Sequence, residues 1–302
     1  RLYGRNVVRQ TRGELAMIRS YRLVRGACRQ RRSTFSTLLR SEMIRLHRSS
    51  IAMLHVALAV AIGLAAGAYF ATTPWDPLLA YDAFVQLLGA GAALLAGISC
   101  GLSLDTEREA GEYANLLGHP LRCRTFGAKG VVLLGLGALA CLCALLLFLG
   151  ILAMAGKPTP SASTVVLSFA ALAAGSTTLY AIALATALAW GRNAAIAIGA
   201  LGFMIALASL GGLGNGLVTG TLSASLAPFA LIAVPFTWPA RLAALSVEVP
   251  LAAAMPHAQE TLDALLANAA TSTALCAVGT IVSIVLWLIW VKRFEDRRRT
   301  KE

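Results

Sequence analysis

Six long runs without a charged residue set the strongest limit on how this 302-residue chain can fold. Each run is apolar and about 20 residues long or longer, the length that an α-helix needs to cross a bilayer. The runs cover residues 51–72, 83–104, 130–155, 165–189, 194–213 and 271–291. Lipid offers backbone groups no hydrogen-bond partner, so such segments are helical. The sequence therefore predicts an all-α integral membrane protein with six transmembrane helices.

The composition agrees with this fold class. Hydrophobic residues make up 58% of the chain, charged residues 13%, and the mean hydropathy is +0.72. A water-soluble domain with these values would expose large apolar surfaces. In the predicted spans, His55 is the one side chain that is neither apolar nor uncharged-polar, so we expect no ion-coupling group or catalytic constellation at membrane depth.

The net charge of +12 lies mostly outside the spans and predicts their orientation. Thirteen of the 26 basic residues, all Arg, precede residue 51, and six follow residue 290. If both termini and residues 105–129 and 190–193 face the cytosol, that side holds 24 of the 26, as the positive-inside rule requires. A seven-span alternative would put the basic C-terminus outside. No aromatic residues alternate with the basic ones, so no nucleic-acid partner is expected.

The segments that flank the spans divide the rest of the chain. Residues 1–32 are expected to form an Arg-rich cytosolic arm that binds membrane lipid. Residues 292–302 are expected to form a basic cytosolic tail. Residues 33–50 are expected to form an amphipathic helix on the cytosolic face, and residues 51–291 the transmembrane domain that follows it. The apolar side of this helix carries Phe35, Leu38, Leu39, Met43 and Leu46, and the opposite side carries Arg40, Glu42 and Arg45.

The stretch before the last span is apolar but rich in proline and glycine. A straight span is unexpected there, because broken backbone is tolerated at membrane depth only when protein or a cavity surrounds it. We expect a re-entrant or interfacial segment on the outer side over residues 227–239, then a short amphipathic segment over residues 240–266. Trp75, Phe236 and Trp238 are expected at the outer interface, where they are candidates to line the path of an amphiphile.

The loop after the second span is the most informative segment for function. Residues 106–117 read as a short helix, capped by Asp105 or Thr106 and closed by Gly118 and Pro120. On one continuous helix, Arg108, Glu112 and Leu116 would form an exposed ridge, with Tyr113 and Leu117 beside it. Such a ridge suits docking to a soluble partner. The alternative is a solvated loop that only reverses the chain.

This loop resembles that of the ABC-2 type exporter permeases. The likeness is carried by Glu107-Arg108-Glu109-Ala110-Gly111, Leu116-Leu117, Pro120, Arg122 or Arg124, and Lys129. Residues 41–48 and the Pro-Phe-Thr-Trp-Pro stretch at 235–239 look most like the lantibiotic-protection permeases within that family. The Arg-rich arm departs from the subfamily, and the outer segment is too variable for any substrate residue to be carried over.

The resemblance implies a permease subunit in the plasma membrane of a bacterium. It implies partners of three kinds: ABC ATPase subunits, a second permease subunit that is identical or related, and an amphiphilic peptide substrate. The implied coupling helix, which contacts the ATPase, contains Glu107, Arg108, Glu109, Gly111, Glu112, Tyr113, Leu116, Leu117 and Pro120. ATP and Mg would be bound by the partner, so this chain is expected to hold no cofactor, metal or catalytic residue.

The absence of a phosphate-binding loop agrees with that division of labour. No Gly-x-x-x-x-Gly-Lys-Ser/Thr motif is present, since the glycines of residues 214–221 lack a lysine. The alternatives are a membrane-embedded enzyme, a structural or sensor subunit without transport activity, and a permease for another lipid-like molecule or drug.

Overall fold

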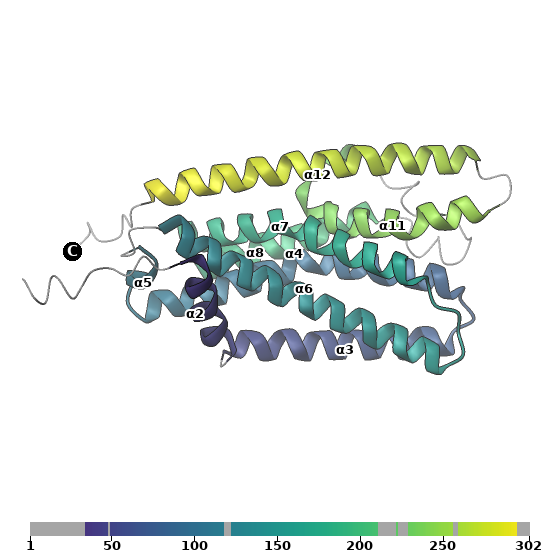
Figure 1. Ribbon diagram of the computed structural model, residues 1–302, viewed down its shortest axis with the longest axis horizontal. Helices are drawn as coiled ribbons and strands as arrows, with labels where there is room; N and C mark the ends of the chain where they lie inside the picture. The colour runs from purple at the N-terminus through teal and green to yellow at the C-terminus, as the bar shows by residue number, and fades with distance from the viewer. Residues whose placement is uncertain are drawn as a thin grey trace, which may run out of the picture.

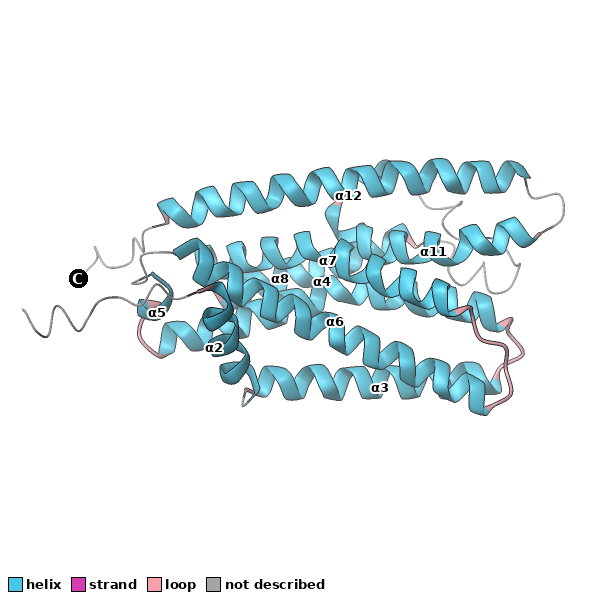
Figure 2. Cartoon of the chain, in the orientation of Figure 1, coloured by secondary structure: helices cyan, strands magenta, loops and turns pink. Residues whose placement is uncertain are grey.

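The computed structural model describes residues 34–47, 49–117, 122–210, 222, 229–255 and 259–294. Within them, six helices are long and apolar enough to cross a membrane, which confirms the predicted number of spans. They are α3 (Ser50–Thr72), α4 (Pro77–Glu109), α6 (Arg122–Met154), α7 (Ala162–Trp190), α8 (Arg192–Ser209) and α12 (Gln259–Arg293). Helices account for nearly all of the described secondary structure, and Figure 2 shows loops mainly at their ends.

Several helices extend past the apolar runs from which they were predicted. α4 and α6 have 33 residues each and α12 has 35, whereas about 20 suffice to cross the hydrocarbon. Glu, Arg, Lys and Leu at their ends are good helix formers, so the helix continues until a residue breaks it. At the start of α4, the Asp76 carboxylate accepts hydrogen bonds from the amides of Leu78 and Leu79, and Pro77 takes the first helical position.

The spans form one bundle, and α4 lies at its centre. α4 packs against α7, α8 and the shorter helix α11 (Trp238–Ala254), while α3 packs mainly against α6 and α12 lies along one edge (Figure 1). Helix α2 (Phe35–His47) crosses one end of the bundle, where the short helix α5 (Ala114–Leu117) also lies. We call this the α2 end and the opposite one the distal end.

The segment before the last span is re-entrant, one of the two predicted alternatives. Two 3-10 turns, η1 (Phe229–Ala233) and η2 (Pro235–Thr237), lead into α11 (Trp238–Ala254), which runs beside the distal half of α12 (Figure 1). Trp238 packs against Gly279, and Pro239 packs against Gly175. Both glycines lie near the middle of their helices, so residues 229–241, which we call the re-entrant tip, reach the middle of the bundle.

Two expectations about this region are wrong. Phe236 and Trp238 do not lie at the outer interface: Phe236 contacts Gly202 inside α8, and Trp238 is 3% exposed. Residues 240–266 are not one amphipathic segment either, because α11 is largely buried and ends at Ala254, and α12 begins at Gln259. Glycine-lined notches on neighbouring helices admit the aromatic rings, and these notches are not apparent from any local pattern.

Charged side chains are also buried in the bundle, contrary to expectation. Asp82 of α4 is 5% exposed, and Arg241 and Glu248 of α11 are 2% and 0% exposed. Asp82 accepts a hydrogen bond from Gln86 Nε2 at 2.7 Å, and Arg241 Nη2 donates to Ser209 Oγ at 3.1 Å. Asp82 lies in the part of α4 that precedes the uncharged run of residues 83–104. Arg241 and Glu248 lie in α11, which corresponds to none of the six runs.

Helix α2 is confirmed, but its faces differ from the prediction. Glu42, expected on the polar outer side, is 7% exposed, while Met43, expected on the apolar side, is 62% exposed. Glu42 turns inward because two cations meet it there, as described below. The arm of residues 1–32 and most of the tail of residues 292–302 lie outside the described residues.

Candidate coupling site at the α2 end

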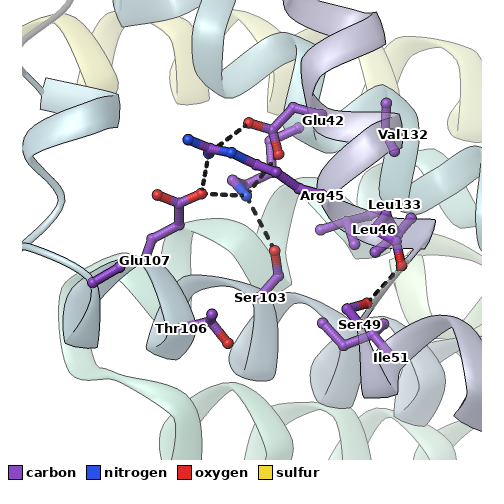
Figure 3. Close-up of a pocket in the computed structure, with 12 residues that line it drawn as sticks. Glu42, Arg45, Leu46, Ser49, Ile51, Ser103, Thr106, Glu107, Val132 and Leu133 are labelled. Carbon is purple, nitrogen blue, oxygen red and sulfur yellow. Dashed lines mark hydrogen bonds and ion pairs between the residues drawn. The ribbon is translucent and has the colours of Figure 1, made fainter.

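Three helices bring charged side chains together at the α2 end. Glu42 and Arg45 come from α2, Ser103 and Glu107 from the last turns of α4, and Lys129 from the first turns of α6. They border a cavity of about 310 Å³, whose apolar walls include Leu46, Val132 and Leu133 (Figure 3). Ser103 and Glu107 are four residues apart, so both point from the same face of α4.

Lys129 is the centre of this cluster. Its ammonium group donates to Glu42 Oε2 at 2.9 Å, to Glu107 Oε1 at 3.2 Å and to Ser103 Oγ at 3.2 Å. These three acceptors match the three N–H donors of a lysine. The side chain is 4% exposed, so it has exchanged water for protein partners.

Arg45 closes the cluster from the solvent side. Its Nη1 contacts Glu42 Oε1 at 3.3 Å and also pairs with Glu107 Oε1, while its side chain remains 46% exposed. Two carboxylates therefore face two cations, and the cluster, which we call the Lys129 cluster, has no net charge (Figure 3).

The energetic role of the Lys129 cluster is to fix geometry rather than to add much stability. Burying ions costs desolvation free energy, which their mutual attraction roughly offsets when hydrogen bonding is complete. Removing one partner, however, leaves an uncompensated buried charge and costs about 3–5 kcal/mol. The cluster therefore holds α2, α4 and α6 in one arrangement and penalises others.

The loop beyond Glu107 is not the continuous helix that the sequence predicts. α4 continues to Glu109, a turn follows at residues 110–113, and α5 has only four residues. Thr106 is not a cap but lies inside α4, where its hydroxyl donates back to the carbonyl of Leu102 at 3.0 Å. Gly111, Glu112 and Tyr113 have φ of 150°, 50° and 64°, and these values end the helix.

Because the helix is broken, the expected ridge does not form, and its residues fall into an exposed group and a buried group. Arg108, Glu109, Gly111 and Glu112 are exposed at the tip of the loop. Glu107, Tyr113 and Leu116 are 8%, 6% and 0% exposed, and Leu117 packs beside them against the core. Pro120 lies outside the described residues. We call residues 108–112 the exposed turn; they are the last two residues of α4 and the first three of the turn that follows.

The residues predicted for an outer path do not form one group. Trp75 is half-buried in the loop between α3 and α4 at the distal end, whereas Phe236 and Trp238 belong to the re-entrant tip. Their part in a substrate path stays a prediction.

The centre of the site falls outside the predicted set of site residues. Glu42, Arg45, Ser103 and Lys129 are far from one another in sequence, except for the pair on α2. A usable signal is that Lys129 directly precedes one apolar run, while Glu107 follows another run by three residues and Glu42 precedes a third by nine. Opposite charges at the same membrane level on separate helices are candidates to pair.

Comparison with known proteins identifies the family. The model of the ABC-2 family transporter protein matches residues 38–209, which is more than half of the chain and extends from α2 through α8. The match includes every member of the Lys129 cluster and the exposed turn. Neither the curated proteins nor the solved structures gave a significant match. The chain is thus a multi-pass membrane protein that belongs to the ABC-2 family of transporters.

Proposed function

We propose that this chain is the permease subunit of an ABC exporter and that separate ATPase subunits dock at the α2 end. A second permease subunit, identical or related, would complete the transporter. The α2 end would face the cytosol, which agrees with the concentration of basic residues at both ends of the sequence.

The observation that carries this proposal is that buried ion pairs attach the exposed turn to three helices. The turn follows directly on Glu107, whose carboxylate is held by Lys129 of α6 and Arg45 of α2. A force on the turn therefore reaches three helices at once through buried contacts. A loop that merely reversed the chain would need no such attachment.

The mechanism follows from this attachment. Closure of the ATPases on ATP would displace the exposed turn, and α2, α4 and α6 would move together because the Lys129 cluster resists separation. Packed helices shift as rigid bodies rather than deform, so the displacement would reach the distal end. The exposed charges of Arg108, Glu109 and Glu112 would set the register of docking.

For the substrate, we propose an amphiphile taken from the membrane, such as a lantibiotic peptide in self-immunity or resistance. The support is the resemblance of residues 41–48 and 235–239 to the lantibiotic-protection permeases. Other lipid-like molecules and drugs remain the alternatives, and transport assays with each class distinguish them.

The test is a charge swap in the exposed turn, Arg108→Glu with Glu109→Lys. The swap keeps the net charge and alters side chains that are exposed, so folding should be retained. We expect the affinity for the partner ABC ATPase to fall about tenfold or more, because charges at a docking surface set orientation and partner choice. Copurification and stimulated ATP hydrolysis in lipid nanodiscs measure the effect.

The matched control is Glu260→Lys, an exposed charge reversal at the distal end. It should leave both properties unchanged. Wild-type binding and ATP hydrolysis in the charge-swap variant would show that the ATPase does not dock at the exposed turn. If the wild-type chain itself binds no ATPase, the permease assignment is wrong.

A further inference from the structure

We propose that α12 acts as a rigid rod that transmits movement from the exposed turn to the re-entrant tip. Arg122 is the positioning residue that holds one end of α12 against the loop, and we call its two hydrogen bonds, to Leu117 and Phe294, the joint. This inference rests on the proposed function for the source of the force. It adds a route through α12, whereas the Lys129 cluster joins α2, α4 and α6.

Arg122 bonds two chain segments that are far apart in sequence. It is the first residue of α6, its Nε donates to the carbonyl of Leu117 at 2.9 Å, and its Nη1 donates to the carbonyl of Phe294 at 3.1 Å. Leu117 ends α5, and Phe294 directly follows α12. Carbonyls at helix C-termini lack partners within the helix and carry partial negative charge, so one guanidinium satisfies both ends.

Apolar packing strengthens the same joint. Tyr113 and Leu116 from the loop share a buried cluster with Val291 of α12, which is 0% exposed, and Trp290 and Phe294 pack against it. The end of α12 also contacts the start of α6. Cys123 Sγ donates to the carbonyl of Leu288, and the rings of Phe126 and Trp287 meet edge to face. Movement of α5 therefore displaces the end of α12 as well.

The other contact of the rod lies halfway along α12. The ring of Trp238 fills the notch at Gly279, and Trp238 Nε1 donates to the carbonyl of Ile232 at 2.8 Å. Beside this notch, the hydroxyls of Thr280 and Thr178 lie 2.9 Å apart. The Thr280–Thr178 contact joins α12 to α7. Because the Trp238 ring fills the notch at Gly279, a shift of α12 along its axis would carry the re-entrant tip with it.

Between the joint at Arg122 and the notch at Gly279, α12 makes few buried contacts. It can therefore shift along its axis without breaking many of them. It is the least buried of the six spans, with 11% of its most apolar window buried. Its buried side chains are Leu265, Ser272, Cys276 and Val291. The first three lie from the distal end to the middle of the helix, and Val291 lies at the joint.

The first experiment needs no partner protein. Hydrogen exchange of the full chain in lipid nanodiscs is compared for the wild type, Arg122→Met and Arg124→Met. Arg124 is the matched control, because it lies two residues further along the same helix but is exposed. We expect amides of residues 291–294 and 114–117 to exchange about tenfold faster in Arg122→Met, since hydrogen bonds to a charged donor are lost. Equal exchange in the two variants would overturn the joint.

The second experiment adds the ATPase and a non-hydrolysable ATP analogue. In the wild type and in Arg124→Met, nucleotide should change exchange both at residues 110–117 and at residues 229–241 of the re-entrant tip. Arg122→Met should keep the first change and lose most of the second, and Arg122→Lys should restore part of it by donating to one carbonyl. A full response at the tip in Arg122→Met would overturn the rod. No response in the wild type would instead count against the proposed function.

Discussion

Lys129 shows how a single ion can be buried at the end of a bundle of apolar helices. Its three donors have three acceptors, and its charge is balanced by Glu42 and Glu107, with Arg45 balancing the second carboxylate. Each of these side chains would be unfavourable in this position alone. The set is therefore stable only as a whole, which ties the position of α2 to that of the two spans.

Replacing Lys129 by Met tests this interdependence. The substitution removes one cation and leaves two carboxylates buried near each other, so we expect a loss of about 3–5 kcal/mol in the free energy of unfolding. Thermal unfolding in detergent measures it. Adding Glu42→Gln should recover part of the loss, because one unpaired charge is then removed. A double variant no more stable than Lys129→Met would contradict the pairing.

At the scale of elements, the re-entrant segment owes its depth to glycines on the surrounding helices. An added Cβ at Gly175 would lie 2.7 Å from the backbone nitrogen of Pro239, and one at Gly279 would overlap the ring of Trp238. Gly89 of α4 is likewise covered by the backbone of Ala240. The tip sits where small residues on separate helices leave space, and it fills that space.

Substituting alanine at Gly175 should unseat the tip. We expect a loss of about 1–3 kcal/mol, because overpacking forces a backbone shift. The matched control is Gly150→Ala in α6, where nothing lies within 4 Å of the added Cβ. That control should be neutral or stabilise by up to about 1 kcal/mol, since alanine is the better helix former. Unfolding curves for both variants decide the point, and equal stabilities would contradict the seating described here.

The spans were predictable because each is an uncharged apolar run long enough to cross a bilayer. The ends of α4 and α12 were not, because charged residues that favour helix continue them past the runs. The depth of Trp238 depends on Gly175 and Gly279, which are remote in sequence. The burial of Glu107 likewise depends on Lys129 and Arg45. Local pattern identified the loop as a candidate site but could not show which of its side chains turn inward.

At the scale of the whole molecule, the distribution of charge predicts the orientation of the chain in the membrane. The α2 end receives the N-terminal helix, the exposed turn and the end of α12, and the sequence places most basic residues next to these elements. The positive-inside rule predicts that this end faces the cytosol.

Reporter fusions test this orientation directly. A reporter placed after Lys157 or Glu260 should be active outside the cell, and one placed after Arg122 or Glu302 should be active in the cytosol. These positions follow from the alternation of the spans along the chain. A cytosolic reporter at residue 260 would be incompatible with six spans in the proposed orientation.

The Lys129 cluster and the seat of Trp238 also differ in when they can form during synthesis. The chain is made from its N-terminus, and early parts begin to fold before later parts exist. Both carboxylates that receive Lys129 precede it, so they have already been made when the lysine leaves the ribosome. Trp238, in contrast, precedes Gly279 by some forty residues, and its notch is incomplete until the last span has been made. A nascent chain would therefore form the Lys129 cluster early, while the re-entrant tip and the end of α12 would reach their final positions last.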